Sequence, residues 1–416
     1  AGAYHHKWFI FGNAKMILSN NGYLGIGTTT PGVALEVIGD ISGSSDSTGS
    51  FGRVHVNGAT LRSDSGITSF GIGTLGANTG NYYNTAFGGD AMSYQTTGER
   101  NTGVGYQAGR NNVSGNYNVF MGFSAGRGAT SGTYHSSVGI GYNALYSVNT
   151  ANKNTAVGAH ALYQIDKGVS SVAIGEAAGF YATGSYNTFV GAEAGKGGTT
   201  SAPYSSGPNN TAIGYAALTA FTSAEDNTVV GMMAGQLLTS GDSNTLLGNA
   251  AGRYMTTTSK TVLIGTNAGD AINSTDANGT VAIGYQAGTS ITEGQRQTFL
   301  GYQAGYSTTT GDENVFIGYQ AGYSNLDNHA NIYIGKQAAY NIGDGSYNVA
   351  IGEEAMKSTG TAADNHANYN VAIGNQAGYG LTTGDYNVFL GSRAGYASTT
   401  VQGNVAIGYN AMQVHT

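Results

Sequence analysis

The sequence predicts an all-β fold, a parallel β-solenoid (β-roll) of 19 coils of about 17 residues, and three observations lead to it. A motif centred on one glycine recurs nineteen times between Thr85 and the end of the 416-residue chain. Of the 18 intervals between these glycines, 13 are 17 residues long. Alanine follows every central glycine by three residues, which predicts a crowded interior position. The central glycines are Gly88, Gly105, Gly122, Gly141, Gly158, Gly175, Gly191, Gly214, Gly231, Gly248, Gly265, Gly284, Gly301, Gly318, Gly335, Gly352, Gly374, Gly391 and Gly408.

The residues just before each central glycine predict the one firm strand of the coil. Counted from that glycine, position −1 is apolar and position −3 is Thr, Val or Ile in every repeat, and β-branched residues favour a strand over a helix. Because side chains alternate across a strand, positions −1 and −3 share one face and position −2 lies on the other. We expect −1 and −3 to face the coil interior. A weaker second strand is expected after the next corner.

The second half of each repeat is rich in Thr, Ser, Gly and Asp, which predicts a polar return turn. Position −4 is Asn in fourteen repeats, for example Asn84, Asn244 and Asn404. Stacked amides at a corner are the favoured interpretation, and a polar binding stripe is the alternative. The four long intervals place their extra residues in the return turn. Variable loops on a rigid scaffold often hold binding residues, so the insertions at 197–209 and 358–369 are predicted to contact glycan.

Position −2 predicts self-association of the chain. It is mostly small or aromatic, as at Phe299, Phe316, Tyr333 and Phe389. If this row lies outside the coil, it forms a continuous apolar strip, which soluble monomers avoid. Burial between symmetry-related copies is the usual solution, so we expect the row to lie against partner chains.

Composition excludes several classes of function. Charged residues make up 9% of the chain and the net charge is −7, so nucleic acid is not expected as a partner. There is no cysteine and no run of eighteen apolar residues, so neither a disulfide framework nor membrane insertion is expected. The chain begins at Ala1, which indicates a processed product, a fragment or the ordered part of something larger.

The sequence also lacks the common catalytic and metal-binding motifs. The sequence has no nucleophile motif, no phosphate loop and no calcium-binding nonapeptide, and its carboxylates are scattered. Two copies of Asp-Asn-His-Ala-Asn, with His329 and His366, differ in register against their central glycines and are interpreted as loop chemistry rather than metal sites. We therefore expect no enzyme activity, no cofactor and no metal.

The first eighty residues do not follow the repeat. Residues 7–11 and 15–18 predict two short strands around Gly12 and Asn13, a hairpin signal. We expect three regions: an N-terminal β module at 1–43, a β connector at 44–80 and the parallel β-solenoid at 81–416.

Two motifs resemble known fibre proteins. The segment 25–31 (GIGTTTP), followed by a short apolar strand and the GDISG of 39–43, resembles a module of phage tail fibres and of bacterial surface proteins that mature with an endosialidase-type chaperone. The NVAIG sequence of 348–352 and 404–408 resembles the head repeats of trimeric autotransporter adhesins, although those repeats are shorter. The resemblance implies a left-handed β-roll and an intertwined or side-by-side homotrimer. It also implies an extracellular location, on a virion tail fibre or a cell surface.

The frequent tyrosines are the candidate binding residues. The chain has 29, and they recur at positions +1, +5 and −5. A tyrosine ring can stack on a sugar, and ladder packing within or between chains is the competing interpretation. The candidate ligand-binding residues are Tyr204, Tyr306, Tyr323, Tyr340, Tyr379 and Tyr396.

The predicted function is a structural and receptor-recognition fibre, the shaft or tip of a phage tail fibre, that binds host cell-surface glycan multivalently. The alternative is a bacterial surface adhesin or extracellular filament of the same trimeric architecture. An ice-binding solenoid is disfavoured, because Thr and Val alternate irregularly at position −3 and are expected to point inward.

Overall fold

The computed structural model describes residues 4–10, 13–19, 22–26, 30, 35–37, 54–56, 59–64, 67–78, 83–129, 132–198 and 204–413. It divides the chain into two units, Ala1–Gly52 and Arg53–Thr416. The second unit therefore includes most of the region predicted as a connector.

The first unit is a small four-stranded sheet in the order β1-β2-β3-β4. Strands β1 (Tyr4–Ile10) and β2 (Asn13–Ser19) pair antiparallel, which confirms the predicted hairpin. Strand β3 (Leu24–Ile26) pairs antiparallel with β2, and β4 (Leu35–Val37) pairs parallel with β3. Much of the motif at 25–31 and all of 39–43 lie outside the described residues.

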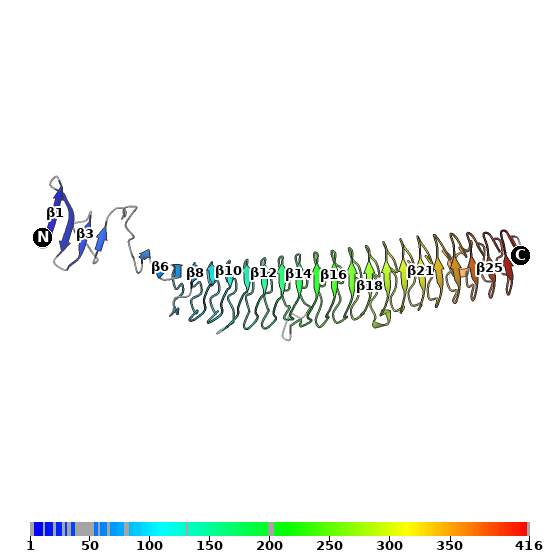
Figure 1. The fold of residues 1–416 in the computed structure, drawn as a ribbon, viewed down its shortest axis with the longest axis horizontal. Coiled ribbons are helices and arrows are strands. Elements are labelled where there is room, and N and C mark those ends of the chain that lie inside the picture. Colours follow the sequence, from blue (N-terminus) through cyan, green and yellow to red (C-terminus); the bar gives the residue numbers. More distant parts are fainter. Residues whose placement is uncertain are drawn as a thin grey trace. The chain divides into compact units, whose positions relative to one another are not determined.

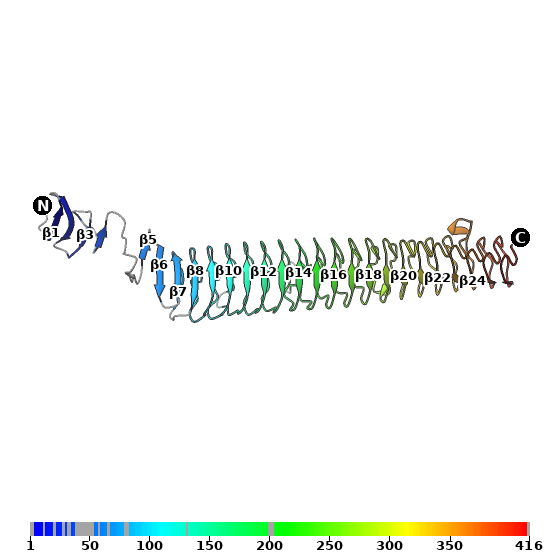
Figure 2. The same cartoon turned by 45° about the horizontal axis from the view of Figure 1, so that its top comes forward.

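The second unit is the predicted parallel β-solenoid, with one short strand in each of 19 coils (Figure 1). Strands β5 (Val54–Val56), β6 (Ala59–Asp64) and β7 (Ile67–Gly71) form antiparallel pairs, and β7 then pairs parallel with β8. From β8 on, each strand pairs parallel and in register with the next (Figure 2). These strands are β8 (Asn84–Phe87), β9 (Thr102–Val104), β10 (Val119–Met121), β11 (Val138–Ile140), β12 (Thr155–Val157), β13 (Val172–Ile174), β14 (Thr188–Val190), β15 (Thr211–Ile213), β16 (Thr228–Val230), β17 (Thr245–Leu247), β18 (Val262–Ile264), β19 (Val281–Ile283), β20 (Thr298–Leu300), β21 (Val315–Ile317), β22 (Ile332–Ile334), β23 (Val349–Ile351), β24 (Val371–Ile373), β25 (Val388–Leu390) and β26 (Val405–Ile407).

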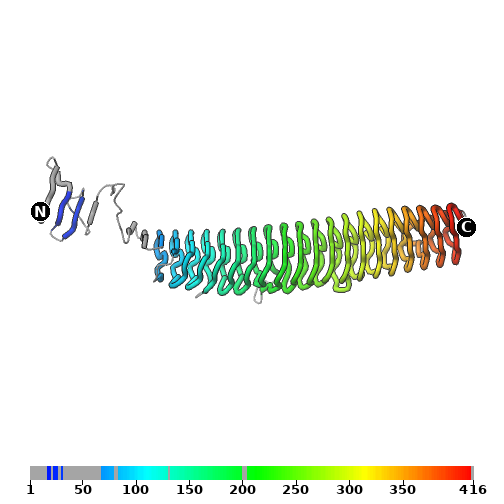
Figure 3. Tube along the Cα trace, in the orientation of Figure 1, coloured from blue at the N-terminus to red at the C-terminus, as the bar shows by residue number. Residues whose placement is uncertain are grey.

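The return side of the coil is held by backbone hydrogen bonds without a second named strand in the described residues. The N–H of Thr222 donates to the carbonyl of Thr239 at 2.8 Å, and the N–H of Thr239 donates to that of Thr256 at 2.7 Å. The two short 3₁₀ helices, η1 (Thr275–Ala277) and η2 (Ala362–Asp364), lie in long intervals. Successive coils stack one on the next along the solenoid (Figure 3), so each coil forms hydrogen bonds mainly with the coil before it and the coil after it.

The prediction of which strand face is buried was wrong. Position −2 faces the interior, and Phe299, Phe316, Tyr333 and Phe389 are each 0% exposed. Positions −1 and −3 point outward and are partly or fully exposed in all of β8 to β26. Both faces are apolar, so hydrophobicity alone does not choose between them. The interior takes the flat rings of position −2 because they fit a narrow coil, packed beside position +3 alanines and position +7 apolar residues such as Ile291.

This reversal also removes one argument against ice binding. The −3 threonines do point outward, as in β14 to β17, where four successive coils carry Thr at this position. Val still replaces Thr irregularly along the rest of the row, which disfavours the regular threonine array of an ice-binding solenoid.

The central glycine is required by both conformation and space. In every coil its φ lies between +118° and +143°, a range that residues with a side chain rarely adopt. A Cβ at each of these glycines except Gly408 would lie 2.2–2.8 Å from the carbonyl group of the next central glycine. The glycine therefore recurs once per coil because neighbouring coils approach each other this closely at every turn.

The asparagines at position −4 form the predicted corner ladder. Asn331 is buried, its Oδ1 accepts the backbone N–H of Asn348 at 2.8 Å, and its Nδ2 donates to the carbonyl of Gly345 at 2.9 Å. The same pair of bonds recurs at Asn227, whose Oδ1 accepts from the N–H of Asn244 at 2.9 Å. These amides satisfy buried backbone groups where the chain turns, and their burial leaves them unavailable to a ligand.

Replacing an interior alanine tests the packing directly. Ala304 is 0% exposed, at position +3 of its coil. Ala304→Leu should overpack the coil and lower the free energy of unfolding by about 1–3 kcal/mol. Thermal and denaturant unfolding would measure the loss. Ala397→Leu, in a half-buried turn position, is the control, and equal melting temperatures for the two variants would contradict the assignment.

Candidate functional site

Half-buried and exposed aromatic side chains of the solenoid are arranged in ladders along the stack of coils. At position +5, Tyr306, Tyr323 and Tyr340 stack with ring centres 4.9 Å apart in both pairs and ring planes within 10°. Tyr379 and Tyr396 form a second stack of the same position, also at 4.9 Å. One tyrosine per coil at a fixed position gives this spacing, because neighbouring parallel strands lie about 4.8 Å apart.

The stacking decides what these tyrosines can offer a ligand. The faces of Tyr323 are turned toward Tyr306 on one side and Tyr340 on the other. The ring edges and hydroxyls therefore form the surface, and sugar stacking on a ring face is restricted to the ends of a ladder. The side chains remain half-buried. Burial raises the pKa of Tyr323, and the neighbouring Tyr340, Tyr306 and Tyr302 raise it further, so its hydroxyl is a neutral donor at physiological pH.

Two more rows run beside this ladder. At position +1, Tyr285, Tyr302 and Tyr319 stack at 5.2 and 5.3 Å. At position +2, four glutamines form a side-chain amide chain joined by three hydrogen bonds of 2.9–3.0 Å, each from an Nε2 to the Oε1 of the glutamine in the preceding coil; they are Gln286, Gln303, Gln320 and Gln337. All three rows are present in the coils of Gly301 and Gly318, where they offer phenol hydroxyls and amides without a charge.

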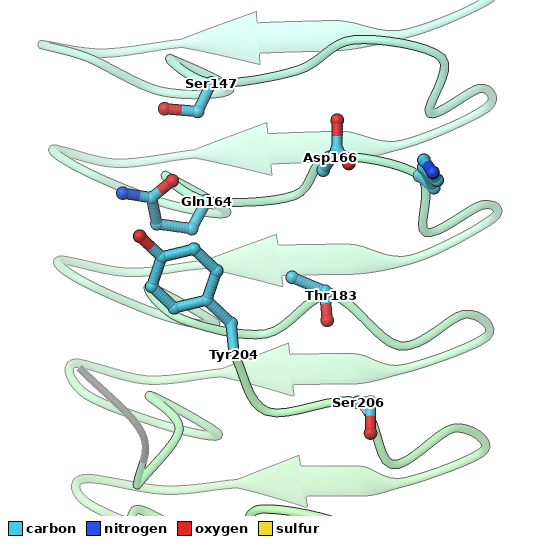
Figure 4. A pocket seen from close by; sticks show the side chains of 7 residues that line it. Ser147, Gln164, Asp166, Thr183, Tyr204 and Ser206 are labelled. Carbon is cyan, nitrogen blue, oxygen red and sulfur yellow. The ribbon is translucent and has the colours of Figure 1, made fainter. Parts of the chain in front are cut away.

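Tyr204 lies apart from these rows, on the longest insertion. It is half-buried and its ring stacks on Tyr181 at 6.0 Å. It lines an open groove of about 520 Å³ with Gln164, Asp166, Lys167 and others, and its hydroxyl points toward Gln164 (Figure 4). The insertion has a proline on each side of Tyr204, a pattern that predicts a ring held outward; Pro203 lies outside the described residues.

The structure thus distributes the six candidate tyrosines over three separate places: Tyr306, Tyr323 and Tyr340 in one stack, Tyr379 and Tyr396 in another, and Tyr204 in the groove. The two histidines of the repeated Asp-Asn-His-Ala-Asn motif each lie near one aspartate, His329 at 3.8 Å from Asp312 and His366 at 3.5 Å from Asp344. In the described part of the chain, no three His, Asp or Glu side chains are grouped to hold a metal ion.

A second groove, which the sequence did not indicate, lies near the first coils. It has a volume of about 360 Å³ and is lined by Tyr94, Thr96, Arg110, Asn111 and Arg127 with two apolar side chains. The guanidinium carbon of Arg110 lies 5.0 Å from the ring centre of Tyr94. That of Arg127 lies 5.1 Å from the ring centre of Tyr146. The signal in the sequence is that both arginines occupy position +5, in successive repeats.

Comparison of the chain with protein-family models, with curated proteins and with solved structures finds no match. Among the described residues, none forms a helix with the length and apolarity needed to cross a bilayer.

Proposed function

We propose that the chain is a structural and receptor-recognition fibre that assembles as a homotrimer and binds cell-surface glycan multivalently, as the shaft or tip of a phage tail fibre. The observation that carries the proposal is the uninterrupted parallel ladder of nineteen coils. Such a scaffold is quasi-one-dimensional, so it builds length and repeats surface positions at a constant spacing. Long, repetitive surfaces suit attachment through many weak contacts.

The outward strand face supports assembly. Positions −1 and −3 of the nineteen coils carry only Thr, Val, Ile, Leu, Met and Phe, with no charged residue. Leu300 is 44% exposed, Ile174 43% and Leu390 42%. A continuous uncharged strip of this kind is rare on a soluble monomer, and cyclic symmetry buries it. The interface that was expected at position −2 is therefore proposed at positions −1 and −3.

The tyrosine ladders and the two grooves support recognition. Their ring edges, hydroxyls and amides lie at positions +1, +2, +5 and in the insertion, on other parts of the coil than the strand face. A trimer would present each of them three times, and linked sites raise avidity without stronger single contacts.

Substitution of charged residues into the outward strand face tests the proposed oligomer. Leu247→Glu combined with Leu300→Glu should convert an oligomer into a folded monomer, because both side chains lie outside the coil at 44% exposure. Native mass spectrometry would give the mass and circular dichroism the fold. Tyr215→Glu with Tyr302→Glu, which places two charges on another face, should leave the oligomer intact.

Binding of the chain to host cells tests the second half of the proposal, the recognition of a cell surface. The wild-type chain should bind cells of the correct host, and the monomeric variant should bind them much more weakly because avidity is lost. A wild-type chain that is a stable soluble monomer would end the proposed assembly. A wild-type oligomer that binds no cell surface would leave only the structural role.

A further inference from the structure

The strongest unexplained feature is a pair of arginines without carboxylate partners. Position +5 carries five cations along the solenoid: Arg110, Arg127, Lys196, Arg253 and Lys357. Three of them have an acidic partner. Lys196 pairs with Glu193 at 2.8 Å, Arg253 with Asp270 at 3.5 Å, and Lys357 with Glu354 at 2.7 Å. No carboxylate lies within ion-pair distance of Arg110 or Arg127 in the described part of the chain.

The contrast between Arg253 and Arg110 shows what is unusual. The coil after Arg253 places Asp270 at the same position, so the ladder continues with the opposite charge. The coil after Arg110 places Arg127 there, so two positive charges follow one another. The two guanidinium groups lean to opposite sides, Arg110 toward Tyr94 of the preceding coil and Arg127 toward Tyr146 of the following coil. Both arginines line one groove that has no acidic side chain, so their positive charges are not neutralised there.

Both guanidinium groups are held in place and retain free donors. Arg110 Nη2 donates to the Tyr94 hydroxyl at 3.3 Å, and Arg127 Nη1 donates to the Tyr146 hydroxyl at 2.8 Å. The Nε atoms of both arginines are buried and have no hydrogen-bond partner among the described residues. A guanidinium has five N–H donors, so most of the donors of each arginine remain unused.

The groove that contains the pair has room for one small ligand. Its volume is about 360 Å³, and no acidic side chain lines it. Ligand sites commonly begin at about 300 Å³ and combine an apolar lining with a few fixed polar groups. Tyr94 supplies the aromatic wall, and Thr96 and Asn111 supply the neutral polar groups.

We propose that the groove at Arg110 and Arg127 binds the carboxylate of an acidic sugar residue, such as a hexuronic or sialic acid. This inference rests on the proposed function and names the glycan class for one of its surfaces. The planar fork of arginine matches the two oxygens of a carboxylate, and the second arginine adds a positive charge to the lining of the same groove. The sugar ring then lies against Tyr94 and Thr96.

Binding of defined sugars to the full chain tests the proposal. By calorimetry or NMR titration, glucuronic acid and N-acetylneuraminic acid should bind and glucose should not. Arg110→Gln and Arg127→Gln should each weaken acid binding by about tenfold or more, since a hydrogen bond to a charged group is lost. Arg253→Gln is the matched control, because Arg253 also lies against a tyrosine ring, with its guanidinium carbon 4.2 Å from the centre of Tyr254, but has Asp270 as its partner. It should leave the affinity unchanged.

A second measurement does not need a ligand. Without an anion, Arg110→Gln and Arg127→Gln should lower the melting temperature only slightly, because each loses one hydrogen bond to a tyrosine hydroxyl and leaves no carboxylate unpaired. Arg253→Gln should lower it more, because Asp270 is left unpaired, and burial already raises the pKa of that carboxyl. Losses in the Arg110 and Arg127 variants as large as that of Arg253→Gln would show that the pair is structural and overturn the proposal.

The remaining outcomes separate the two proposals. Absent glucuronic acid binding, equal binding of glucose, or an equal loss in Arg253→Gln each overturns the acidic-sugar site. Tighter binding of inorganic phosphate than of either acidic sugar would also overturn it, in favour of a simple anion site. If the wild type and both arginine variants bind host cells equally well, recognition lies elsewhere on the fibre and the fibre function survives. If the wild type binds no cells, the recognition function fails independently of the groove.

Discussion

Gly301→Ala should cause the largest loss of stability of any conservative change in the solenoid. The new Cβ would lie 2.3 Å from the carbonyl oxygen of Gly318, and the glycine has a φ of +143°. Backbone strain and overpacking together should lower the free energy of unfolding by about 4 kcal/mol or more. Because each coil contacts only its neighbours, we expect the stack to open first between the coils of Gly301 and Gly318.

Hydrogen exchange would locate this opening, and Gly408→Ala is the matched control. Gly408 occupies the same position of the repeat with a φ of +118°, but a Cβ added there would meet nothing within 4 Å. It therefore carries the conformational strain without the collision between coils. Equal melting temperatures and equal exchange protection in the two variants would show that close coil approach is not the reason for the regular spacing of glycines along this chain.

Phe316→Ala should give the second large effect. Phe316 is fully buried and its ring stacks between Phe299 at 4.9 Å and Tyr333 at 4.7 Å, with ring planes within 8°. Truncation would leave a cavity between the rings of the two neighbouring coils and cost about 3–5 kcal/mol. Chemical denaturation monitored by tyrosine fluorescence would measure the loss.

Tyr319→Ala is the comparison for Phe316→Ala. Tyr319 also belongs to a stack of three aromatic rings, at its end, but it is 46% exposed, so its removal should change stability by less than half as much. The pair of variants also separates the two possible faces of the strand. If position −2 lay between chains, Phe316→Ala would weaken association and its effect would vary with protein concentration. A concentration-independent loss identifies an interior residue.

The fold was predictable from the sequence to the extent that one dominant constraint acted on each position. Only glycine avoids a collision with the next coil at the central position, and only a side chain as small as alanine fits the narrow space at position +3. Both residues therefore recur without exception and reveal the period. The inward face of the strand was not predictable. Ile283 at position −1 and Phe299 at position −2 of the next coil are both apolar, and only the width of the finished coil selects the aromatic row for the interior.

The candidate binding residues show the same division. Their recurrence at position +5 predicted ladders of tyrosine, and the stack of Tyr306, Tyr323 and Tyr340 confirms this packing. The sequence did not show that such a stack covers the ring faces, because that depends on the spacing between coils. The arginine pair was missed for a different reason. Arg110 and Arg127 are only informative against Arg253, whose partner Asp270 appears beside it once the coils are stacked.

Because every strand pairs with the next in the same register, the length of the solenoid is set by its number of coils. Removing or adding one complete 17-residue repeat joins strands that already pair in the same register, as β20 and β21 do, so the remaining coils keep their bonds. The distance between the two ends of the solenoid then changes in steps of about 4.8 Å, the separation of adjacent strands. Reach can thus be adjusted by recombination between repeats, one step at a time, while the grooves and ladders on the retained coils keep their geometry.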